Sequence, residues 1–148
     1  MAYFKFTDAI YNDRTIDVYN HGAMQRDFTY IDDVTIALAA LIDHIPQADP
    51  EWTAPDPATD PASARAPYRL YNIGNHTPEN LSDMIAMLEE LTGKSAGKNY
   101  VDMQAGEVAA TYADIDDLYM AIGFQPRTTL KDGLSAFLDW YKWYYGVR

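Results

Sequence analysis

The densest group of polar residues in the chain lies between Gly22 and Asp33. Within it, Arg26 follows a glycine turn and precedes a segment with the β-branched and aromatic residues typical of a strand. A strand in that place would direct the guanidinium into a cleft, where its planar fork suits a diphosphate or a carboxylate. Residue type alone leaves two hypotheses open, an anion-binding arginine or, more commonly, an arginine paired with a neighbouring acid.

A second polar cluster occupies residues 104–108, in a predicted loop ahead of a helix. Glu107 in this loop could accept two hydrogen bonds from a vicinal diol such as a ribose. The alternative hypothesis is a solvated loop acid, which is the more frequent role of glutamate. The sequence pattern around Glu107 leaves both alternatives open.

Aromatic side chains crowd the end of the last predicted helix, at Trp140, Trp143, Tyr144 and Tyr145. These rings could form a ligand platform, a partner surface or part of the core. Their helical spacing favours the core, with a few exposed tips.

Several catalytic patterns are missing from the sequence. No two glycines have the Gly-x-Gly spacing of a dinucleotide fingerprint, and no tyrosine stands four residues before a lysine. The three histidines are scattered and give no metal-ligand pattern, and no Gly-x-Ser-x-Gly elbow is present. The sequence therefore predicts no catalytic residue and no metal site in this chain.

Length and composition exclude further classes of protein. The length of 148 residues suits one domain, and the content of 48% hydrophobic and 14% aromatic residues is typical of a folded chain. A net charge of −11 argues against a nucleic-acid partner, and the absence of cysteine excludes disulfides and thiolate chemistry. Because no apolar run approaches the roughly 20 residues of a membrane span, we expect no membrane contact. No basic-then-apolar leader opens the chain, so we expect a soluble, cytoplasmic protein.

Hydrophobic periodicity and capping residues predict the elements that would position these side chains. The expected elements are a helix over 1–12, strands over 16–19 and 27–31, a helix over 34–42 capped by Asp32 or Asp33, a strand over 68–73, a helix capped by Thr77 with Pro78 at its first position and closed by Gly93, a strand over 99–103, a helix capped by Asp114 and closed by Gly123, and a last helix capped by Thr129. Residues 46–67 hold six of the eight prolines, which predicts a long exposed loop within a single region spanning 1–148. Strands alternating with helices indicate an α/β or α+β architecture.

Six segments in order along the chain carry a family resemblance; they are residues 1–7, 16–22, 26–33, 71–75, 111–114 and 123–126. Together they resemble the C-terminal half of the nucleotide-sugar epimerases and dehydratases of the extended short-chain dehydrogenase/reductase superfamily. The likeness runs from Met1 to Arg148. The amino-acid sequence of residues 17–22 and the proline-rich insertion are most similar to the UDP-glucuronate 4-epimerase branch.

The resemblance implies part of a larger enzyme. In this family an N-terminal Rossmann domain carries the glycine-rich NAD loop and the Ser/Thr, Tyr and Lys that transfer protons. Family epimerases move hydride from the sugar C4 to NAD⁺ and return it to the other face of the 4-keto sugar. We therefore expect a chain that lacks the Rossmann portion, binds no cofactor by itself and is inactive alone. The uncapped helix at Met1 favours truncation.

The resemblance also assigns binding roles to residues. It implies that the strand Asp17, Val18 and Tyr19 lies along the uracil through main-chain contacts, that Arg26 contacts the diphosphate and that Phe28 packs near the base or ribose.

Two further positions depart from the family pattern. Glu107 matches an acid that binds the ribose hydroxyls, where the family usually has Asp. Gln104 stands where many relatives have an arginine, so phosphate binding would rest more on Arg26. The segment from Tyr30 to Asp33 is expected to be structural.

Three hypotheses remain at this point. The first is the UDP-sugar-binding half of an NAD-dependent 4-epimerase, whose partner is the missing Rossmann portion. The second is a stand-alone module that binds a nucleotide sugar or a protein without catalysis, and the third is a folded product that binds nothing. For the first, strand edges and an apolar face left uncovered predict self-association of the isolated chain.

Overall fold

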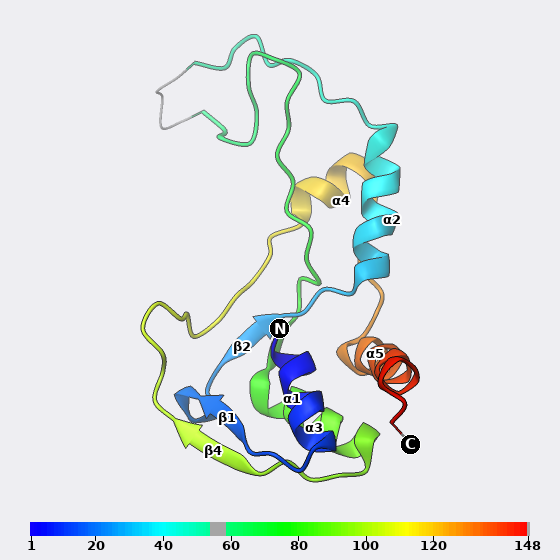
Figure 1. Cartoon of the computed structure of the whole chain (residues 1–148). Helices are drawn as coiled ribbons and strands as arrows, with labels where there is room; N and C mark the ends of the chain where they lie inside the picture. Colours follow the sequence, from blue (N-terminus) through cyan, green and yellow to red (C-terminus); the bar gives the residue numbers. More distant parts are fainter. Residues whose placement is uncertain (54–58, 148) are drawn as a thin grey trace.

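The computed structural model describes residues 1–53 and 59–147. In chain order the elements are α1 (Ala2–Tyr11), β1 (Ile16–Tyr19), a short 3-10 turn (Asn20–Gly22), β2 (Gln25–Asp27), α2 (Ile31–Ile42), β3 (Pro78–Asn80), α3 (Leu81–Thr92), β4 (Lys98–Val101), α4 (Asp116–Ile122) and α5 (Leu130–Tyr145). Helices α1, α3 and α5 and all four strands form a compact body, from which α2 and α4 extend (Figure 1). The mixed α/β fold class expected from the sequence is confirmed.

The core lies between α1, α3, α5 and β1. Its buried side chains are Ala9, Ile10, Ile16, Val18, Met24, Leu81, Met84, Ile85, Leu88, Leu130, Leu134 and Leu138. On α3 the buried residues recur at the three- and four-residue spacing of one helix face, as the sequence predicted. In β1, Ile16 and Val18 point into this core while Asp17 and Tyr19 point outward. The core therefore fixes which two side chains of β1 are available to a ligand.

Within residues 1–53 and 59–147, the four strands form two separate pairs. Strand β1 runs parallel to β4, with Ile16 opposite Lys98 and Tyr19 opposite Val101. Strand β2 runs antiparallel to β3, with Arg26 opposite Glu79. The predicted strands at 16–19 and 99–103 are confirmed, the second starting and ending slightly earlier.

Two predicted elements around these pairs are wrong. The strand expected at 27–31 is β2, which ends at Asp27. Thr77 and Pro78 do not start a helix, because Pro78 begins β3 and the helix starts at Leu81 after the N-cap Asn80. A proline is tolerated at the first residue of an edge strand, where its missing N–H is not needed.

The strand predicted at 68–73 is also wrong. This segment makes one isolated bridge, between Ser63 and Arg69. Arg69 is held instead by ion pairs to Asp60 at 2.5 Å and to Asp117 at 2.6 Å. Hydrogen bonds of the side chain, rather than a strand ladder, attach the segment to α4.

Two further expectations stay predictions. They are the exposed loop over residues 46–67 and the single region spanning 1–148. The described part of the loop contains turns and one bridged residue, Ser63, and residues 54–58 lie outside the described residues.

The helix caps follow the sequence only in part. Thr129 accepts the N–H of Asp132 at 3.1 Å, which confirms the predicted cap of α5. Asp114 accepts the N–H of Asp116, although the N-cap of α4 is Ile115. The prediction that Asp32 or Asp33 caps α2 is wrong. The Asp33 carboxylate is buried and accepts the main-chain N–H of Thr128 at 3.1 Å, which ties α2 to the segment before α5.

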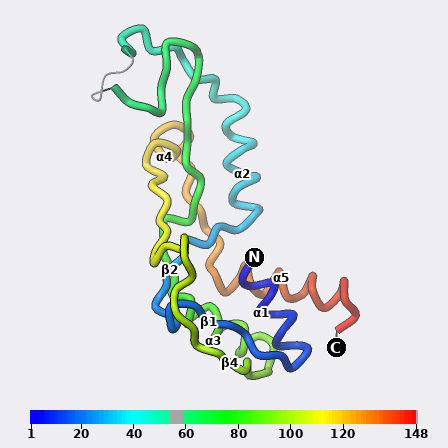
Figure 2. The backbone as a smooth tube through the Cα atoms, turned by 60° about the vertical axis from the view of Figure 1, so that its left-hand side comes forward, coloured from blue at the N-terminus to red at the C-terminus, as the bar shows by residue number. Residues whose placement is uncertain are grey.

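Helix α2 is more exposed than its apolar pattern predicts. Helical spacing predicts one inward face, made by Val34, Ala37, Leu38, Leu41 and Ile42. Of these five, Ala37 alone is buried, while Leu38 is 51% and Ile42 77% exposed. Figure 2 shows α2 standing away from the body that contains α1, α3 and α5. Within the described residues, an apolar helix face is thus left in contact with solvent. No described helix is long and apolar enough to cross a membrane. The cytoplasmic location stays a prediction.

The Asp27 carboxylate connects three segments of the chain. It accepts the main-chain N–H groups of Asn75 at 3.0 Å, His76 at 3.1 Å and Ala113 at 3.0 Å. The Asp27 N–H in turn donates to the Thr111 hydroxyl at 3.1 Å. Gly74 lies so close that an added Cβ would overlap Ala113. This tight junction joins β2 to the segments before β3 and before α4.

We predict that Asp27→Asn lowers the free energy of unfolding by about 2–3 kcal/mol, because an amide nitrogen would face donors where an oxygen now accepts them. Urea denaturation followed by circular dichroism measures the change. The control is Asp139→Asn on the exposed side of α5, which should change stability by about 0.5 kcal/mol or less. Equal stability of the two variants would show that the Asp27 junction is dispensable.

Candidate functional site

A cavity of about 170 Å³ lies where α1, β1, β2 and the loop before α4 meet. It is lined by Ala2, Phe6, Asp17, Tyr19, Met24, Arg26, Phe28, Leu81 and Glu107. Five of the seven residues that the sequence assigned to ligand binding are among them, namely Asp17, Tyr19, Arg26, Phe28 and Glu107. The structure therefore brings residues from distant parts of the chain to one cavity, while their roles stay predictions.

Arg26 is held in a defined orientation. Its Nη2 lies 2.8 Å from Glu107 Oε2, and its Nη1 donates to the carbonyls of Gln25 at 2.7 Å and of Ala109 at 3.4 Å. The Arg26 side chain is 24% exposed. The sequence left open an ion pair or an anion site, and the structure shows the ion pair inside a cavity large enough for part of a ligand.

Glu107 is placed by main-chain contacts. Its N–H donates to the Gln104 carbonyl at 3.1 Å, and Gly106 between them has a φ of 88°, a conformation that glycine adopts readily. After this turn the chain runs beside β2, because the Gln25 N–H donates to the Ala109 carbonyl and the Thr111 N–H to the Gln25 carbonyl. The main-chain positions of Arg26 and Glu107 relative to each other are thus held by these hydrogen bonds.

Val18 and Gln104 do not line the cavity. Val18 is 1% exposed and belongs to the core, so only its main chain is available to a ligand. Gln104 is exposed at the start of the turn that leads to Glu107. Asp17 does line the cavity, and its Oδ1 accepts from the Asn99 amide at 2.8 Å.

Sequence reasoning missed the apolar lining of this cavity, which is made by Ala2, Phe6, Met24 and Leu81. Ala2 and Phe6 are four residues apart and therefore share a face of α1. That four-residue spacing is the signal in the sequence that could have identified this face. Met24 and Leu81 come together through the contact of β2 with β3, which the sequence did not predict.

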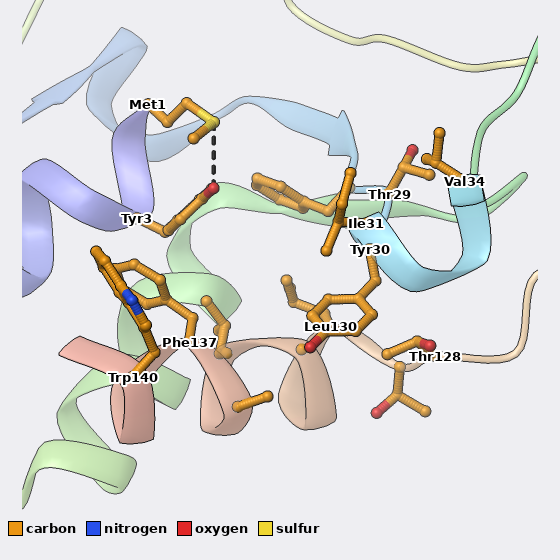
Figure 3. Close-up of a pocket in the computed structure, with 15 residues that line it drawn as sticks. Met1, Tyr3, Thr29, Tyr30, Ile31, Val34, Thr128, Leu130, Phe137 and Trp140 are labelled. Carbon is orange, nitrogen blue, oxygen red and sulfur yellow. Dashed lines mark hydrogen bonds between the residues drawn. The ribbon is translucent and has the colours of Figure 1, made fainter. Parts of the chain in front are cut away.

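A second, larger cavity of about 520 Å³ lies between the start of α1, the segment 28–34 and α5. Figure 3 shows Tyr3, Ile31, Leu130, Phe137 and Trp140 around it, and the Tyr3 hydroxyl donates to Met1 Sδ at 3.1 Å. Burial raises the pKa of the Tyr3 phenol. This cavity is mostly apolar and shares Phe28 with the smaller one. It suits apolar side chains better than a charged ligand.

The aromatic end of α5 lies largely outside the core. Tyr141 is buried at 2% exposure, but Trp143 is 77% and Tyr144 61% exposed. The prediction that Trp140, Trp143, Tyr144 and Tyr145 belong to the core is therefore wrong, because all four rings are exposed. Instead they pack along their own helix, as in the stacking of Trp140 on Tyr144 at 5.2 Å between ring centroids.

The chain is similar to longer proteins over nearly all of its length. No family model matches it. It is 51% identical over 145 residues to protein CapI of Staphylococcus aureus, a match that covers 98% of this chain and 43% of that protein. It is 41% identical over 141 residues to a probable UDP-glucuronate 4-epimerase of Rhizobium meliloti strain 1021, covering 95% of this chain and 41% of that protein.

A solved structure agrees with these relatives. The UDP-glucuronic acid 4-epimerase of Bacillus cereus, in complex with UDP-glucuronic acid and NAD, aligns with a TM-score of 0.77 and 28% identity, covering 98% of this chain and 40% of that one. The chain thus spans about two fifths of the length of the proteins that it matches. The resemblance inferred from the sequence motifs is confirmed. The aligned part is a C-terminal portion of the epimerase fold.

Proposed function

We propose that this chain, a homologue of the C-terminal portion of the UDP-glucuronate 4-epimerases, forms the UDP-sugar-binding part of an NAD-dependent 4-epimerase. The observation that carries the proposal is the cavity in which the Arg26 guanidinium and the Glu107 carboxylate lie 2.8 Å apart. A cation for phosphate and an acceptor for hydroxyls, side by side, match the junction of a nucleoside with its diphosphate. The solved relative with UDP-glucuronic acid bound supports this ligand class.

Each lining group has a role in this proposal. Arg26 donates to the diphosphate, and Glu107 accepts from the ribose hydroxyls. The uracil lies along β1 and meets its main chain, because the Val18 side chain is committed to the core. In the described residues β1 pairs with β4 alone, so its other edge has polar main-chain groups to offer. Phe28 packs near the base or ribose.

We propose that this chain does not supply the main site for NAD. A dinucleotide site needs a glycine-rich turn that leads from a strand into the N-terminus of a helix. The sequence contains no Gly-x-Gly, and each described helix starts after a segment without paired glycines. We infer that the remaining three fifths of a longer protein hold NAD and the proton-transfer residues, and that this chain alone is inactive.

The exposed apolar surface favours a part of a larger protein over a stand-alone module. We define the apolar face as Ile31, Leu38 and Ile42 of α2, at 62%, 51% and 77% exposure, together with the larger cavity that Ile31 also lines. Single soluble domains rarely expose contiguous apolar surface of this kind. We propose that the missing Rossmann portion covers the apolar face in the complete enzyme.

The test of the binding function is Arg26→Ala. We predict that this variant binds UDP more weakly by about 1.5–3 kcal/mol, or about 10- to 150-fold in Kd, because a charged donor to the diphosphate is lost. Isothermal titration calorimetry of the folded chain gives the Kd. The matched control is Arg127→Ala, an exposed arginine that does not line the smaller cavity. An unchanged Kd for Arg26→Ala would remove this residue from the site, and no UDP binding by the unaltered chain would refute the proposed function.

The isolated chain should self-associate through its apolar face and the free edge of β1. We predict that the double variant Leu38→Gln and Ile42→Gln shifts the association midpoint to at least about fivefold higher concentration, because less apolar area is buried on association. Light scattering over a concentration series measures the shift, with Ala40→Gln on the other side of α2 as the control. A strictly monomeric parent chain at high concentration would contradict this prediction.

A further inference from the structure

The ion pair in the smaller cavity has a consequence for ligand choice. The guanidinium of Arg26 uses Nη1 for two main-chain carbonyls and Nη2 for Glu107. In the free chain, the carboxylate therefore occupies an edge of the guanidinium that an incoming phosphate would use. The cation is already neutralised before any ligand arrives.

The pairing of Arg26 with Glu107 is selective. Glu79 is the residue opposite Arg26 in the β2–β3 ladder, yet the ion pair described for Arg26 is with Glu107, which is 81 positions away along the chain. Main-chain bonds of Gln25 to Ala109 and Thr111 hold the two segments together. Because the backbone is fixed on both sides, the pair can open only by rotation of the two side chains.

The free-energy cost of opening the ion pair between Arg26 and Glu107 differs between ligands. A ligand that takes Arg26 leaves the Glu107 carboxylate, whose side chain is 41% exposed, without its cation at the edge of the same cavity. A nucleoside diphosphate can offer the carboxylate two ribose hydroxyls in place of the guanidinium. A bare phosphate or pyrophosphate offers no such donors and places like charges side by side, which is unfavourable.

We propose that Glu107 is a specificity-determining residue that competes with phosphate for Arg26, so that the site rejects bare phosphates and accepts ligands with a vicinal diol beside the phosphate. This inference rests on the proposed UDP-sugar site and adds a repulsive element to it. Specific sites commonly combine attraction to the right ligand with a penalty against the wrong one. If Glu107 served only to orient Arg26, its removal would weaken phosphate binding instead of strengthening it.

The test is Glu107→Gln, with Glu79→Gln as the matched control. Both variants remove one negative charge near Arg26, but Glu79 neither lines the cavity nor forms the described ion pair. Calorimetry of the folded chain with UDP, 2′,3′-dideoxy-UDP and pyrophosphate gives three Kd values for each protein. We expect Glu107→Gln to bind pyrophosphate at least about threefold tighter and to lose at least about threefold of the preference for UDP over its dideoxy analogue. Glu79→Gln should leave both quantities unchanged.

Two kinds of result would overturn the inference. Pyrophosphate affinity that is unchanged or weaker in Glu107→Gln would show that this acid orients Arg26 and does not compete. Equal effects of the two variants would show a general charge effect with no role for the ion pair. In both cases a parent chain that binds UDP leaves the proposed function standing, whereas a parent chain that binds no UDP refutes the proposed function and the inference together.

Discussion

The position of the candidate site depends on one carboxylate. Asp27 accepts three main-chain N–H groups from two segments far apart in the sequence, and its own N–H donates to Thr111. Arg26 is the neighbour of Asp27 in β2, and Glu107 lies four residues before Thr111. Arg26 is thus next to the junction, and the main-chain bonds of Gln25 with Ala109 and Thr111 bring the segment of Glu107 beside it. The close approach of Gly74 to Ala113 leaves no room for a larger residue there, which keeps the junction tight.

The two halves of the molecule are held by different forces. The body around α1, α3 and α5 has a continuous apolar core. In the extension that contains α2 and α4, the Asp33 carboxylate accepts the N–H of Thr128, and the ion pairs of Arg69 to Asp60 and Asp117 join segments of the extension to one another. The buried apolar side chains described there are Ala37, Ile115 and Leu118. Exposed ion pairs contribute little to stability, generally about 1 kcal/mol or less. Burial of apolar side chains in the extension is incomplete, because Ile31, Leu38 and Ile42 of α2 are exposed.

Some local signals in the sequence were reliable, whereas others failed, among them the predicted cap by Asp32 or Asp33 and the strand at 68–73. The Thr129 cap, the buried face of α3 and the strand β1 follow from residues within a few positions of one another. The β2–β3 ladder and the buried role of Asp33 depend on segments distant in the chain, which no local pattern reports. The same division holds for the site. The family motifs predicted Arg26 and Glu107 as site residues. The lining by Met24 and Leu81 could not be predicted, because it depends on the β2–β3 ladder.

The parallel pair of β1 with β4 has a consequence for how the chain folds. The side chains of Asp17 and Asn99, which face each other across this pair, are 82 positions apart in the sequence. Pairing over such a distance must overcome a large loop-closure entropy and slows folding. During synthesis, β1 emerges from the ribosome long before its partner, so its edge stays open to other nascent chains. The segment that carries Glu107 is made later still, so the cavity cannot be complete before that segment has been synthesised.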